Sequence, residues 1–81
     1  MTTIYADITT DLNGRITDHS TVTVLGHTAP VPTRSRDGWH IGSIRVAEAV
    51  RSLGYRVVVN GITIDTGRPD LVRIIVTPKG A

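Results

Sequence analysis

The side chains best suited to chemistry lie in a long predicted loop, residues 26–40, just ahead of the most helical stretch of the chain. Two arginines there offer guanidinium groups that pair with phosphates, and a tryptophan and a histidine beside them offer rings on which bases stack. A later turn supplies one more arginine. The predicted nucleic-acid contact therefore consists of Arg34, Arg36, Trp39, His40 and Arg68.

Trp39 has a second interpretation. If helical geometry begins early, its side chain projects onto the apolar side of the following helix and becomes a buried anchor, which leaves only two arginines in the segment. The net charge of +2 permits weak attraction to nucleic acid but falls short of the dense basic face of a dedicated binder. Nucleic-acid binding is therefore kept as the alternative function.

A minimal hydrolase or metal enzyme is a remote alternative. Its residues would be His27, Asp37, His40 and Ser43. The chain has no Cys, no His-x3-His spacing and no Gly-x-Ser-x-Gly elbow, and Ser43 is explained more simply as a helix N-cap. We therefore expect no catalytic residues, no metal and no cofactor.

The helix that would follow this segment is predicted within residues 37–54. One side of it is apolar, formed by Val46, Ala49, Val50 and Leu53. The opposite side carries Arg45, Glu48 and Arg51 at intervals of three, which predicts an exposed face with ion pairs. Gly54 supplies the left-handed residue that ends a helix.

Two strands are predicted before the helix, at residues 3–10 and 16–25, because apolar and polar residues alternate there. Asp11 to Gly14 between them suits a type I turn closed by a glycine bulge. That turn would pair Ile4 with Val22 and keep the apolar residues of both strands on one face.

After the helix, the sequence predicts a hairpin of residues 55–59 and 62–65 around the turn Asn60-Gly61. Its register would place Val57 opposite Ile64, and Arg56 opposite Asp65. A last strand is predicted at residues 71–77.

The predicted fold is one α+β domain of residues 1–81, an antiparallel sheet with a single packed helix in the order ββαβββ. Five strands span about 20 Å and a helix covers only about 10 Å, so part of the sheet needs another cover. Apolar residues left outside the expected core predict a protein interface, or a sheet that curls to bury them. They are Tyr5, Ile44, Val58 and Ile75.

These observations predict a small non-enzymatic accessory protein that docks to a protein partner or to itself, as a homodimer for example. The start of the chain lacks the pattern of a secretory signal and no stretch approaches a membrane span, so a cytoplasmic location without membrane contact is expected. All basic residues but Lys79 are Arg, a bias typical of GC-rich genomes. We hypothesise that a bacteriophage of such a host encodes the chain.

Overall fold

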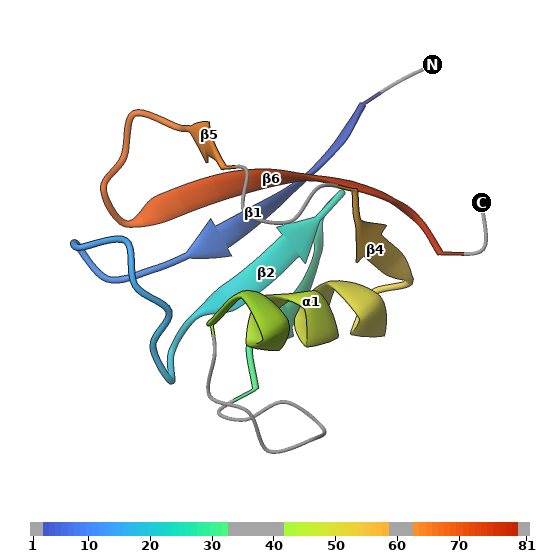
Figure 1. The fold of residues 1–81 in the computed structure, drawn as a ribbon, viewed down its shortest axis with the longest axis horizontal. Coiled ribbons are helices and arrows are strands. Elements are labelled where there is room, and N and C mark those ends of the chain that lie inside the picture. Colours follow the sequence, from blue (N-terminus) through green and yellow to red (C-terminus); the bar gives the residue numbers. More distant parts are fainter. Residues whose placement is uncertain (1–2, 33–41, 59–62, 80–81) are drawn as a thin grey trace.

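The computed structural model describes residues 3–32, 42–58 and 63–79, and these form an α+β domain with one helix and a curled antiparallel sheet (Figure 1). The elements are β1 (Ile4–Thr9), β2 (Thr21–Val24), β3 (His27–Pro30), α1 (Gly42–Ser52), β4 (Tyr55–Val57), β5 (Ile64–Asp65) and β6 (Leu71–Pro78). The predicted class is confirmed, and β3 is a strand that was not predicted. It forms the first part of the segment expected to be a loop. A search of the described helix for a stretch long and apolar enough to cross a membrane finds none.

The longest strand, β6, lies inside the sheet. The strand order is β3-β2-β1-β6-β4, and β5 also pairs with β6. One edge of β6 pairs with β1 along six residues, and the other edge pairs with β4 and then with β5. The β-branched residues that fill β6 favour the extended backbone that this double pairing requires.

The turn between β1 and β2 forms as predicted, but the register does not. The amide of Gly14 donates to the carbonyl of Asp11 at 3.0 Å, and Gly14 has φ 77°. A second turn then interrupts the predicted strand, because the amide of Thr17 donates to the hydroxyl of Ser20 at 2.8 Å. Val22 consequently pairs with Ile8 rather than with Ile4.

The predicted hairpin of residues 55–65 is wrong. Both of its strands pair with β6 instead of with each other: Val57 lies opposite Val76, and Ile64 lies opposite Arg73. The predicted pair of Arg56 and Asp65 is absent for the same reason. The outer edge of β6 would otherwise expose unpaired backbone groups, and β4 and β5 satisfy these groups in turn.

The core lies between α1 and one face of the sheet. The helix packs on β2, β3 and β4, and Figure 1 shows it across the sheet in front of β2. Its predicted apolar side is confirmed, and the amide of Gly54, at φ 90°, closes the last turn on the carbonyl of Arg51. The buried apolar residues are Ala6, Ile8, Val22, Val24, Val31, Val46, Ala49, Val50, Ile74 and Val76.

The predicted exposed face of the helix is wrong at Arg45, because the side chain of Arg45 is buried. Its Nε donates to the carbonyl of Pro32 at 2.7 Å, and its Nη2 lies 3.8 Å from the carboxylate of the exposed Asp18. The Nη2 atom is itself buried and has no hydrogen-bond partner among the described residues. Arg45 thus joins the start of α1 to the chain that follows β3.

The turn from β2 to β3 contains a strained residue, and this gives a first prediction. Leu25 and Gly26 both have positive φ, 49° and 85°, and Leu25 is 69% exposed. A Leu in this region costs about 1–2 kcal/mol, whereas Asn adopts it readily. Leu25→Asn should therefore raise the free energy of unfolding by about 1 kcal/mol, and the midpoint of thermal unfolding by about 4–8 °C.

The matched control is Leu25→Ala, which removes the exposed side chain but retains a Cβ atom. It should leave the midpoint near that of the wild type. Equal gains from both substitutions would show that exposure of Leu25, rather than its backbone conformation, limits stability.

Candidate functional site

One face of the sheet points away from α1, and no described element packs over it. We call it the free face. Direct strand pairing sets its side chains in register, since residues opposite each other in antiparallel strands share a face. The side chains of the free face include Tyr5, Asp7, Thr9, Thr21, Thr23, Thr28, Val58, Ile64, Leu71, Arg73 and Ile75.

An apolar row crosses the free face at right angles to the strands. Tyr5 on β1 lies opposite Ile75 on β6, and the amide of Val58 donates to the carbonyl of Ile75 at 3.1 Å. Tyr5 is 42% exposed and Val58 is 51% exposed. Three of the four residues predicted to form an interface are therefore neighbours. Ile44 is exposed on α1 and belongs to the other side of the sheet.

A charged cluster lies beside this row. Arg73 donates from Nε to Asp7 at 2.7 Å and from Nη2 at 3.3 Å, and its Cζ atom lies 5.4 Å from the centroid of the Tyr5 ring. The hydrogen bond to Asp7 raises the pKa of Arg73 above its ordinary value, and the attraction between the two charges adds to it. The aromatic ring, the guanidinium and the carboxylate hold one another in place at the centre of the face.

Threonines fill the other half of the free face, and their hydroxyls bond to one another. Thr23 and Thr28 approach to 2.9 Å, and Thr9 and Thr21 to 3.2 Å. The amide of Thr21 also donates to the hydroxyl of Thr9 at 2.7 Å. Because these hydroxyls are already hydrogen-bonded to one another, this half of the free face presents mainly methyl groups and hydroxyls that already have partners.

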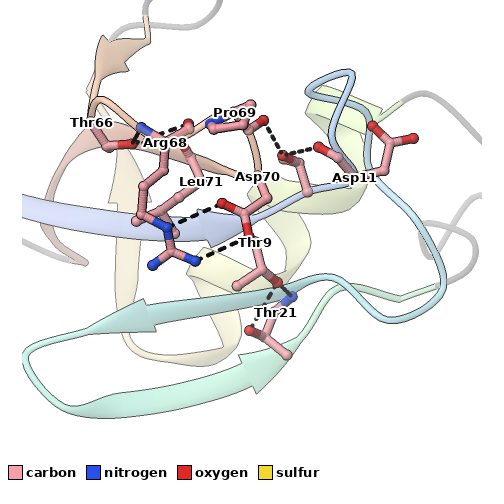
Figure 2. A network of polar contacts seen from close by, with 9 residues as sticks. Thr9, Asp11, Thr21, Thr66, Arg68, Pro69, Asp70 and Leu71 are labelled. Carbon is pink, nitrogen blue, oxygen red and sulfur yellow. Dashed lines mark hydrogen bonds and ion pairs between the residues drawn. The ribbon is translucent and has the colours of Figure 1, made fainter.

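Arg68 belongs to a polar network at the end of the sheet, shown in Figure 2. Both carboxylate oxygens of Asp70 accept from it, at 3.1 and 3.0 Å. This hydrogen bonding lowers the pKa of Asp70 and raises that of Arg68. The amide of Thr10 donates to the carbonyl of Asp70 at 2.9 Å, which joins the turn to the end of β1. The charge of Arg68 is thus already matched within its own turn.

The other residues of the predicted nucleic-acid contact, namely Arg34, Arg36, Trp39 and His40, lie outside the described residues. The same holds for Asp37 of the hydrolase alternative and for the side chain of Ser43. His27 is exposed at the end of β3. Within the described ranges, no three His, Cys, Asp or Glu side chains are grouped closely enough to hold a metal ion.

Comparison of the chain with protein-family models, with curated proteins and with solved structures gave no match. The geometry of the free face is therefore the basis for proposing a function.

The sequence did not predict the charged cluster of Asp7 and Arg73 on this surface. Sixty-six positions separate them in the chain, and they meet only because β1 and β6 are neighbours. The alternation in each strand places both outside the core. Predicting a salt bridge between them requires the strand order, and no local sequence pattern gives that order.

Proposed function

We propose that the chain is a small non-enzymatic interaction protein that docks through the free face. The apolar row of Tyr5, Ile75 and Val58 is the observation that carries this proposal. A half-exposed Tyr and Val in one row retain apolar area that contact with another chain would remove from water.

The charged cluster supports the same role. Tyr and Arg are the residue types that most often dominate protein interfaces, because they combine large contact area with directed polar groups. Arg73 already lies between Tyr5 and Asp7, so docking would order few further torsions. A surface that is rigid before binding loses less conformational entropy when a partner arrives.

Site-specific photo-crosslinking in the native host tests the proposal whatever the partner is. A photoreactive phenylalanine analogue at Tyr5 should give a discrete crosslinked product, which mass spectrometry identifies. The same analogue at Ile44, which lies across the sheet on α1, should give none. Failure to crosslink at position 5, or equal products at both positions, would remove the free face from consideration.

The double substitution Val58→Arg with Ile75→Arg should reduce that product at least about tenfold, since two charges would enter an apolar contact. Ile44→Arg is the matched control and should leave the yield unchanged. Circular dichroism checks that each variant is folded. An undiminished product from the folded double variant would show that the contact lies elsewhere.

A further inference from the structure

The cross-strand rows of the free face indicate what covers it. The row next to the apolar one is fixed by strand pairing across five strands, and its members are Thr28, Thr23, Asp7, Arg73 and Ile64. Its acidic member lies on β1 and its basic member on β6, which are the two neighbouring strands near the middle of the sheet. The charges are therefore arranged about the line between β1 and β6.

A two-fold axis of a dimer can run parallel to that line, above the free face. Rotating a second copy by half a turn about an axis parallel to the strands, between β1 and β6, brings the two free faces together. Each β1 then lies over the partner's β6. Asp7 of either copy faces Arg73 of the other, and Tyr5 of either copy faces Ile75 of the other. The two salt bridges become a square of alternating charges, and the apolar rows meet along their length.

From this self-complementarity we propose that a second copy of this chain covers the free face, as a two-fold symmetric dimer with β1 packed over the partner's β6. This inference rests on the proposed function and names its partner. Charge is what favours a second copy over an unrelated chain, because the face presents the charge pattern that its own rotated image needs.

The area of the free face sets the expected strength of association in the dimer. Five strands at about 4.8 Å spacing and about six residues of strand length give roughly 400 Å² per copy, or roughly 800 Å² for the pair. That total lies at the low end for specific contacts, where complexes are weak and reversible. We expect the dimer to become populated at protein concentrations on the order of 100 µM, as measured by sedimentation equilibrium.

Charge exchange between two variants tests the arrangement. In Asp7→Arg, two positive side chains would face two more across the axis, and in Arg73→Asp the same holds for negative ones. Each variant alone should associate at least about tenfold more weakly than the wild type. An equimolar mixture should recover association, because every facing pair is then opposite in sign. A mixture as weak as its components, or a wild type that stays monomeric at these concentrations, would overturn the dimer.

A second measurement keeps the test independent of the charge variants. The chain has no Cys, so Thr23→Cys in one preparation and Ile64→Cys in another introduce one thiol each. These positions are three strands apart within a chain but face each other across the axis. A short bismaleimide should crosslink the mixture far more than either preparation alone. Equal crosslinking in all three samples would exclude this axis.

The two proposals fail in different ways. A photo-crosslink from position 5 to a different protein, with no recovery in the charge mixture, would retain docking through the free face and overturn the second copy as its partner. The absence of any product from position 5 would overturn both.

Discussion

Val50→Ala should lower the free energy of unfolding by about 2–3 kcal/mol, since it removes two methyl groups from a closed site and leaves a cavity. Val50 is fully buried at the centre of the contact between α1 and the sheet. A domain of this length is stabilised by only about 4–12 kcal/mol in total. The substitution should therefore remove a large fraction of the stability, as measured by urea or thermal unfolding.

Val58→Ala is the matched control, because it deletes the same atoms from a side chain that is 51% exposed. It should change the free energy of unfolding by less than about 0.5 kcal/mol in the monomer. Similar losses from both substitutions would mean that the free face is covered even in the monomer, and would contradict the position assigned to Val58.

Arg45→Ala should lower the free energy of unfolding by about 1.5–3 kcal/mol, the range for a hydrogen bond that involves a charged group. Its Nε atom donates to the carbonyl of Pro32 at 2.7 Å, and truncation leaves that carbonyl without the donor. The stem of the side chain also packs at the start of α1, so its removal opens space beside the core. Chemical denaturation of the purified variant measures the loss.

Two controls separate the contributions of Arg45. Arg45→Met retains most of the volume without the charge and should recover part of the loss, since apolar replacements of buried charges are often tolerated. Asp18→Asn should have little effect, because Asp18 is 73% exposed and lies 3.8 Å from Nη2. An Arg45→Ala variant as stable as the wild type would show that the buried guanidinium contributes nothing net.

The inward-facing side chains of β2 were predictable from the sequence, whereas the register of β2 was not. Val22 and Val24 point into the core as their alternation predicts, although Val22 pairs four positions away from the expected partner on β1. The turn at Thr17–Ser20 accounts for those four residues. Because four is an even number, the strand returns with the same residues facing inward.

β4 and β5 depart further from the prediction, because Val57 and Ile64 were predicted to share the core face, whereas Ile64 pairs with Arg73 and lies on the free face. The chain advances seven positions from Val57 to Ile64, while its partner strand advances three, from Val76 to Arg73. Four residues are again in excess. Asn60-Gly61 is a strong local signal for a hairpin, but the choice of partner was decided by the free edge of β6, which lies later in the sequence.

The candidate surface was predictable in part for the same reason. Alternation alone places Tyr5, Val58 and Ile75 outside the core, and the structure adds that they are neighbours. The burial of Arg45 was not predictable from helical spacing, because its hydrogen-bond acceptor at Pro32 comes from a segment whose path only the folded chain defines.

The two edges of the sheet have a further consequence. β3 is four residues long and ends at Pro30, which has no amide hydrogen to donate, and the opposite edge is divided between β4 and β5, of three and two residues. Fibril growth needs long, flat, unpaired edges on which strand after strand can be added. A concentrated solution of this chain should therefore resist conversion to amyloid. Any assembly that the chain forms should contain a small, fixed number of copies and should not grow without limit.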